Sequence, residues 1–328
     1  MSSCDRNNPK DRPWLTPAEQ VAHLKLKGVR FELMSEAEAT DYLKRNSNYF
    51  RLRAYRTGFS KVEEGSRAGQ YANLDFKMLV DLSVIDMLLR YEMLPLTLDI
   101  EHFVKVRLLN EIERQGEDGY AIVRDFISSY NNTCSDGTVS NRVCDEIARG
   151  SSSPYLADLI HRYKPGYEFP AWSFVEVITF GTFLYFYRFC ADRFDDRDLR
   201  VEFYLLQSVK SLRNACAHNN CILNNLVAGD PMYRPCHAVT QELGKVPGIG
   251  SEMRGSKMSN DRLQQITTVL YTHRLVASDG VSRHRAQSLS VFLDRMNRHP
   301  EYYAGNCQVL SSFDYLTKVI NAWFPLEA

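Results

Sequence analysis

The residue types best suited to chemistry in this sequence lie in one short stretch, Arg213-Asn214-Ala215-Cys216-Ala217-His218. A guanidinium, a carboxamide and an imidazole fall within about one and a half turns of a predicted helix. A guanidinium can hold two phosphate oxygens in bidentate fashion, and an imidazole, with a reference pKa of about 6.5, transfers protons near neutral pH. These groups suit the cleavage of a phosphodiester, and RNA brings its own nucleophile, the ribose 2′-hydroxyl.

The spacing of these residues restricts how they can act together. At about 100° per residue, Asn214 and His218 share one helix face, with Lys210 one turn earlier on the same stripe. Arg213 and His218 are about 140° apart on an ideal helix, so one isolated helix does not direct both at the same atom. Either the helix ends or bends near His218, where the two following asparagines tolerate left-handed geometry, or a second copy completes the site across a symmetric dimer interface.

A second informative segment is the apolar run over residues 174–190. Its pattern predicts a buried bundle helix, apolar nearly all round and too short for a membrane span. Glu176 then lies in an apolar neighbourhood, where a carboxylate needs a cation to stay charged. We hypothesise that Glu176 pairs with Arg213 and orients its guanidinium. The alternative is a glutamate that extends to solvent.

Aromatic and arginine side chains alternate in a segment near the N-terminus: Tyr49, Arg51, Arg53, Tyr55 and Arg56. Such a segment can stack on bases and neutralise the phosphates of an RNA strand. The alternative is a helix whose aromatic residues enter the core while its arginines reach solvent or pair with acids. Both interpretations remain open from the sequence.

Composition sets the limits on partners and compartment. Forty basic and forty acidic residues cancel in a chain of 328, so RNA binding must rest on a local basic surface. Eight cysteines without a Cys-x-x-Cys pair are typical of reduced thiols, and the N-terminus lacks the apolar core of a secretory signal, so we expect a soluble cytoplasmic protein. No Gly-rich phosphate loop and no His-Glu-x-x-His spacing occurs, so we expect neither a cofactor nor a metal site.

Helix signals dominate the chain, and no strand-like alternation stands out. Ser/Thr-x-x-Glu capping boxes begin helices at Thr16 and Ser35. A long helical pattern covers 74–113, where Pro95 should end or kink the first half near Met93. Further helices are predicted over 142–148, 259–276, 282–297 and 313–323.

Several local features give narrower predictions. Asp86 with Arg90, and Arg107 with Glu111, have the spacing of structural ion pairs within a helix. Asp198 is placed to cap the motif helix. The stretch 226–257 is rich in Gly and Pro and indicates a long connection.

The motif resembles a known family. Arg213-Asn214-(three residues)-His218 is similar to the R-[polar]-x-x-x-H motif of HEPN-domain ribonucleases. With the following Ile-Leu-Asn, it resembles the R-N-x-x-A-H-x-x-R-L-x-N segment of the bacterial Abi abortive-infection family (AbiD/AbiF type). The run from Pro170 is similar to the family's P-x-W-x-x-x-E-x-x-S-F-G-x-x-x-x-x-Y, with Thr179 in the Ser place, and Cys221 stands where the family usually has an arginine.

This resemblance implies an all-α fold, a HEPN-type helical bundle with helical extensions at both ends. We expect an N-terminal extension over 1–72, a HEPN-like core over 73–228 and a C-terminal helical region over 229–328. It also implies a homodimer whose two motif helices form one composite cleft, and a metal-independent ribonuclease that leaves a 2′,3′-cyclic phosphate. A role in phage defence, restrained by an RNA or protein antitoxin, follows from the same likeness.

Within that mechanism His218 transfers protons, Arg213 stabilises the extra charge of the transition state, and Asn214 orients the imidazole or the phosphate. Two alternatives stay open. The chain is either an RNA- or nucleotide-binding HEPN module without cleavage activity, or a structural partner of a separate toxin.

Overall fold

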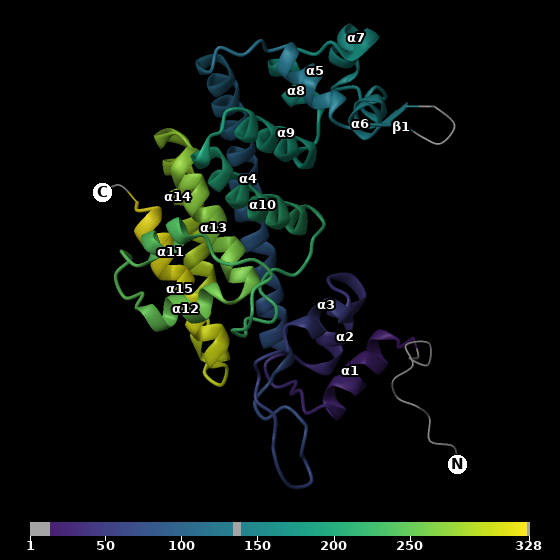
Figure 1. Cartoon of the computed structure of the whole chain (residues 1–328). Helices are drawn as coiled ribbons and strands as arrows, with labels where there is room; N and C mark the ends of the chain where they lie inside the picture. Colours follow the sequence, from purple (N-terminus) through teal and green to yellow (C-terminus); the bar gives the residue numbers. More distant parts are fainter. Residues whose placement is uncertain (1–13, 134–138, 327–328) are drawn as a thin grey trace.

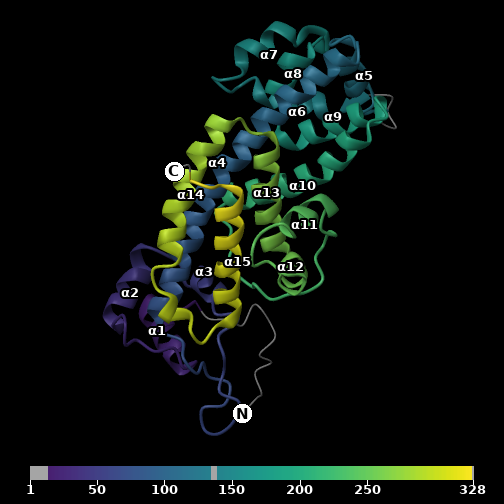
Figure 2. The same cartoon turned by 90° about the vertical axis from the view of Figure 1, so that its left-hand side faces the viewer.

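One helix, α4 (Phe76–Arg114), runs through most of the length of the molecule and contacts every other region (Figures 1 and 2). The computed structural model describes residues 14–133 and 139–326, and apart from one small hairpin its regular elements are helices. The predicted all-α architecture is confirmed. None of the helices in these ranges combines the length and apolar character that crossing a membrane requires.

Three short helices pack at one end of α4 (Figure 1): α1 (Pro17–Leu26), α2 (Glu36–Arg45) and α3 (Tyr49–Ala54). Both predicted capping boxes form. The Thr16 hydroxyl accepts from the Glu19 amide while the Glu19 carboxylate accepts from the Thr16 amide, and Ser35 with Glu38 repeats the arrangement. Gly28, at a φ of 83°, takes the left-handed geometry that turns the chain after α1.

The opposite end of α4 carries a group of short elements: α5 (Ala121–Ser128), β1 (Asn131–Thr133), β2 (Val139–Asn141), α6 (Arg142–Gly150), α7 (Ala157–Tyr163), the 3-10 turn η2 (Pro165–Tyr167), α8 (Ala171–Val177) and α9 (Phe180–Arg193). The single buried helix predicted over 174–190 is wrong, because the backbone is extended at Ile178, with ψ 153°. Thr179 then starts α9 by accepting a hydrogen bond from the Thr182 amide, and Glu146 accepts from the Thr179 amide at 2.7 Å.

The motif lies on α10 (Arg197–Ala217), which packs between α4, α9 and α13. Asp196, and not the predicted Asp198, caps this helix by accepting from the amides of Asp198 and Leu199 at 2.8 and 2.9 Å. The C-terminal helices follow: α11 (His237–Leu243), α12 (Ser251–Met258), α13 (Asp261–Val276), α14 (Asp279–Met296), the 3-10 turn η3 (Pro300–Tyr303) and α15 (Cys307–Trp323). The stretch 226–257 is therefore not a bare connection, because α11 and part of α12 form within it.

Pro95 neither ends nor breaks α4, which continues for 39 residues, so the predicted interruption is wrong. Proline removes one helical hydrogen bond, but the apolar residues around it are buried: Met93 and Leu96 are both 0 % exposed. The Thr97 hydroxyl also donates to the Leu94 carbonyl at 2.7 Å. Packing of α10, α13 and α14 against α4 therefore outweighs the local cost of the proline.

Polar contacts tie α4 to the C-terminal helices. Asp81 accepts hydrogen bonds from Arg295 and from the Tyr303 hydroxyl. Farther along α4, Asp99 accepts from Arg285 through both oxygens at 2.7 and 3.0 Å, and His273 lies 3.0 Å from it. Two arginines of the C-terminal helices, Arg285 and Arg295, are therefore neutralised by acids of α4.

The predicted pair of Asp86 and Arg90 forms and is buried. The predicted pair of Arg107 and Glu111 is wrong, because Arg107 donates instead to Glu202 on α10 at 2.9 Å. Glu111 is then engaged by its neighbour Arg114. Contacts between helices, which spacing along one helix does not reveal, decide the partner.

Candidate functional site

The motif helix ends beside His218, as one of the two predicted alternatives required. His218 is the C-cap of α10, and Asn219 adopts a φ of 56°. The Asn219 amide donates to the Cys216 carbonyl at 3.0 Å, and the Asn220 amide donates to the Ala215 carbonyl at 2.8 Å. This double closure turns the chain sharply after the imidazole. His218 is exposed at the end of the helix.

His218 faces a cleft of about 620 Å³, which we call the histidine cleft. Its motif side is formed by α10 and its cap, and includes Lys210, Asn214 and His218. Its other side is formed by the C-terminal region, namely by Met232, Tyr233, Asp261, Arg262 and Gln265. The cleft therefore combines an imidazole, two cations and an exposed aromatic ring.

Arg213 faces a different opening of about 570 Å³, the arginine pocket, on the other side of α10. Its remaining lining comes from α4, from Leu156 at the start of α7 and from the junction of α8 and α9, and includes Glu101, Lys105, Glu176 and Thr179. Lys210 and Asn214 line both openings. Arg213 also donates a hydrogen bond to the Asn214 carboxamide at 3.3 Å. In one chain, then, the guanidinium and the imidazole lie on two sides of a ridge made by Lys210 and Asn214.

The hypothesised ion pair of Glu176 with Arg213 is not formed. Both side chains line the arginine pocket, but no ion pair between them occurs among the described residues. Because α8 ends at Val177, Glu176 is exposed to solvent, where a carboxylate stays charged without a cation. Nε of Arg213 is buried and has no hydrogen-bond partner within residues 14–133 and 139–326.

The turn after His218 is held by the buried pair of Asp86 and Arg90. One Asp86 oxygen accepts from the amides of Ile222 and Leu223 at 2.7 and 2.6 Å. Arg90 donates to the other Asp86 oxygen and to the Asn220 carbonyl. Asp86 is 0 % and Arg90 2 % exposed, so this network positions the motif turn from inside the fold. The sequence predicted the pair but gave no signal of its second role.

Two of the five residues considered for RNA contact, Arg51 and Tyr55, pack against the same motif turn. Arg51 on α3 donates to the Asn219 carbonyl, the residue after His218. Tyr55 is 2 % exposed, and burial together with the neighbouring Cys221 thiol raises its pKa. The expectation that Tyr55 stacks on RNA is therefore wrong, and Arg51 contacts the motif turn. Arg53 is exposed and Arg56 half-buried, and neither lines the histidine cleft or the arginine pocket.

The cysteines of the motif do not add a nucleophile. Cys216 is buried, and burial raises its pKa to about 11, so the thiol stays protonated at neutral pH. Cys221, in the place of the family's arginine, is half-buried and lines the histidine cleft. Within the described ranges, no group of three or more His, Cys, Asp or Glu side chains is arranged to hold a metal ion.

Comparison with known families decides the chain's membership. The model of the Abi-like protein family matches residues 41–224, more than half of the chain. The chain belongs to the Abi-like family. The matched stretch includes the motif and every residue of the arginine pocket, but it ends before Tyr233 and Arg262, which wall the histidine cleft. No curated protein and no solved structure matches this chain.

Proposed function

We propose that this Abi-like protein is a metal-independent endoribonuclease of bacterial phage defence. Attack by a ribose 2′-hydroxyl on the adjacent phosphorus forms a 2′,3′-cyclic phosphate and releases the 5′-oxygen of the next nucleotide. In the cell its activity is restrained by an RNA or protein antitoxin, since a free ribonuclease arrests growth. The role in abortive infection rests on family membership, and the chemistry rests on the motif.

The side chains of the motif supply the groups that this reaction needs. His218 accepts the proton of the 2′-hydroxyl, and Arg213 holds the non-bridging oxygens as negative charge builds on them. Asn214 lines both openings and accepts a hydrogen bond from Arg213, which suits it to orient the phosphate between the two groups. Lys210, at the same border, adds a second cation.

The observation that carries the proposal is the ridge itself: two openings share Lys210 and Asn214 but divide Arg213 from His218. A second copy of α10 laid across this ridge brings its Arg213 to the phosphate beside the first copy's His218, which returns to the departing 5′-oxygen the proton that it took from the 2′-hydroxyl. The exposed side chains of α10 suit such an approach, because Ser211 and Ala217 are small and Tyr204 is 63 % exposed. The functional unit is then a homodimer with a composite HEPN-type cleft.

The same observation favours one alternative. If no second copy joins the two openings, Arg213 and His218 cannot act on one phosphate, and the chain is a HEPN-type module that binds RNA without cutting it. The two functions differ in whether RNA is shortened, not in whether it is bound.

Cleavage of an end-labelled RNA in the presence of EDTA tests the proposal. We expect a cyclic-phosphate product, identified by mass spectrometry, and a loss of at least about 100-fold in rate for each of Arg213→Ala and His218→Ala. The exposed Arg149→Ala and His161→Ala serve as matched controls and should retain the wild-type rate. Cleavage that requires Mg²⁺, or that survives both motif substitutions, would overturn the nuclease assignment. Binding without cleavage would support the alternative.

A further inference from the structure

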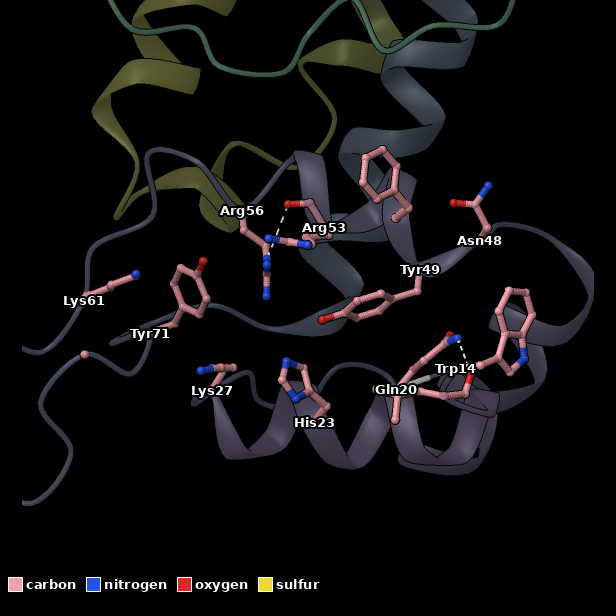
Figure 3. A pocket seen from close by; sticks show the side chains of 13 residues that line it. Trp14, Gln20, His23, Lys27, Asn48, Tyr49, Arg53, Arg56, Lys61 and Tyr71 are labelled. Atoms are coloured by element: carbon pink, nitrogen blue, oxygen red, sulfur yellow. Dashed lines mark hydrogen bonds between the residues drawn. The ribbon is translucent and has the colours of Figure 1, made fainter. Parts of the chain in front are cut away.

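The N-terminal helices enclose an opening of about 1070 Å³ that the motif does not use (Figure 3). We call it the N-terminal pocket. Side chains of α1 and α3 face each other across it, and Lys61 and Tyr71 close one end. Its lining contains five basic side chains, His23, Lys27, Arg53, Arg56 and Lys61.

The cations of this pocket lack acidic partners. No Asp or Glu is among the described residues that line it. Neighbouring basic residues of the same region do pair, for example Lys25 with Glu36 and Arg45 with Asp41. Within residues 14–133 and 139–326, by contrast, no carboxylate forms an ion pair with Lys27, Arg53, Arg56 or Lys61.

The pKa of the His23 imidazole shows that the electrostatic potential in this pocket is positive. Burial, followed by the charges of Lys27, Arg56 and Arg53, lowers the pKa of His23. Positive charge is therefore concentrated here in a protein whose total charge is zero. An anionic ligand would relieve this repulsion.

Aromatic side chains accompany these cations. Trp14 is 95 % and Phe50 77 % exposed, which is unusual for rings of this size. Tyr49 is half-buried, with its ring edge-on to His23 at 6.2 Å between centroids. An inorganic anion would not need these rings, whereas a nucleic-acid strand presents bases to stack on them and phosphates to the arginines.

We propose that the N-terminal pocket binds a single-stranded stretch of RNA, with its phosphates on Arg53 and Arg56 and its bases on Phe50 and Tyr49. The choice of RNA rests on the proposed function, and the site defines the substrate class as unpaired RNA. Helix α3 links this RNA site to the motif turn. This six-residue helix carries Arg53, the turn after it carries Arg56, and both line the pocket, while Arg51 of the same helix donates to the Asn219 carbonyl beside His218.

Binding of a 2′-O-methyl oligoribonucleotide to the full-length protein tests the site without relying on cleavage, because this probe lacks the attacking hydroxyl. Fluorescence anisotropy would compare Arg53→Ala/Arg56→Ala with the control Arg149→Ala/Arg162→Ala, which removes the same charge from exposed positions on α6 and α7. We expect the pocket variant to lose at least about tenfold in affinity, and its slope of log affinity against log salt to shrink by about 1.4, as for two lost phosphate contacts. The control should bind like the wild type.

Stacking is tested separately, so that a misfolded double variant cannot decide the result. Phe50→Ala, at an exposed position, should weaken binding about fivefold or more, whereas Phe50→Tyr retains it. A duplex of the same sequence should bind the wild type more weakly than the single strand. No binding by the wild type, equal binding by the pocket and control variants, or equal binding of duplex and single strand would overturn the inference. If the oligonucleotide binds as expected but natural RNA is not cut, the site stands and the nuclease proposal fails.

Discussion

The two openings beside α10 are walled by different parts of the chain. The arginine pocket is formed by α4, the start of α7, α8, α9 and α10, all inside the stretch shared with the Abi-like family. One wall of the histidine cleft lies beyond that stretch, because Tyr233 and Arg262 line the cleft together with His218. The family's own scaffold thus presents both the guanidinium and the imidazole, but only the imidazole is faced by a wall from the C-terminal region.

The two sides also differ in how they are held. The turn after His218 is fixed by two amides that donate to buried Asp86, and by Arg90 and Arg51, which donate to its carbonyls. Among the residues that the structure describes, the Arg213 side chain donates only to the Asn214 carboxamide, at 3.3 Å. This difference teaches that the backbone turn after the imidazole is fixed by the fold itself, whereas the guanidinium is held mainly by its own neighbour on α10.

Removing Asp86 should have the largest effect, because it leaves Arg90 buried without its counter-charge. We expect Asp86→Ala to lower the free energy of unfolding by about 3–5 kcal/mol. Asp86→Asn should cost less, since its carbonyl can still accept from the Ile222 and Leu223 amides. Urea denaturation followed by circular dichroism measures both. The surface pair offers the control, and Asp41→Ala should cost at most about 1 kcal/mol. Similar losses for Asp86→Ala and Asp41→Ala would contradict the idea that the histidine side is held from within.

Mixing two inactive variants tests whether the two sides are joined across a dimer. We expect Arg213→Ala and His218→Ala to be inactive on their own, whereas a mixed dimer keeps one intact guanidinium facing one intact imidazole from the other chain. Random exchange at equal amounts should therefore restore about a quarter of the wild-type cleavage rate. The mixture must be unfolded and refolded together, and each variant refolded alone is the control. Absence of any recovery in verified mixed dimers would mean that both groups must come from the same chain.

The C-terminal wall should affect substrate binding more than chemistry. Tyr233 is 65 % exposed and lines the histidine cleft, where its ring can stack on a base. We expect Tyr233→Ala to raise KM by about fivefold with kcat changed by less than about twofold. Tyr155→Ala removes an aromatic ring that is 92 % exposed and lines neither opening, and should change neither constant. A fall in kcat without a change in KM would assign Tyr233 to the chemical step instead.

Acid should lower the free energy of unfolding through His273, which joins α13 of the C-terminal region to Asp99 on α4. We expect this effect to be the smallest of the four predicted here. Burial lowers the pKa of His273 despite its contact with Asp99, so the unfolded chain takes up a proton at higher pH than the folded one. The folded state therefore loses stability as pH falls below about 6.5, the reference value for an unfolded histidine. Denaturation of wild type and His273→Gln between pH 7.5 and 5.5 measures this. His273→Gln should show the shallower decline, and exposed His161→Gln should follow the wild type.

What could be predicted from the sequence was local or was carried by the motif. The capping boxes at Thr16 and Ser35 and the end of α10 at His218 depend on neighbouring residues, so local sequence suffices for them. The separation of Arg213 from His218 follows from helical geometry alone. The likeness to the Abi-like family rested on residues that the family match also covers.

The failures have a common cause, which is contact between distant segments. Pro95 stays helical because other helices bury both sides of its turn. The break before Thr179 is supported by Glu146, which lies 33 residues earlier. Tyr55 is buried against the motif turn, and no pattern within 48–56 distinguishes it from an exposed ring. Glu176 lies exposed in the last turn of α8, just before that break.

Helix α4 carries three acids that each fasten a different segment: Asp81 to α14 and η3, Asp86 to the motif turn, and Asp99 to α13 and α14. If α4 shifted by one residue relative to the helices packed on it, all three acids would lose their partners at once. Apolar contacts alone would be less sensitive to such a shift. Breaking the fully buried pair of Asp86 and Arg90 alone costs about 3–5 kcal/mol. Arrangements of the helices that break these pairs are therefore strongly destabilised, which favours the one register of α4 in which all three pairs form.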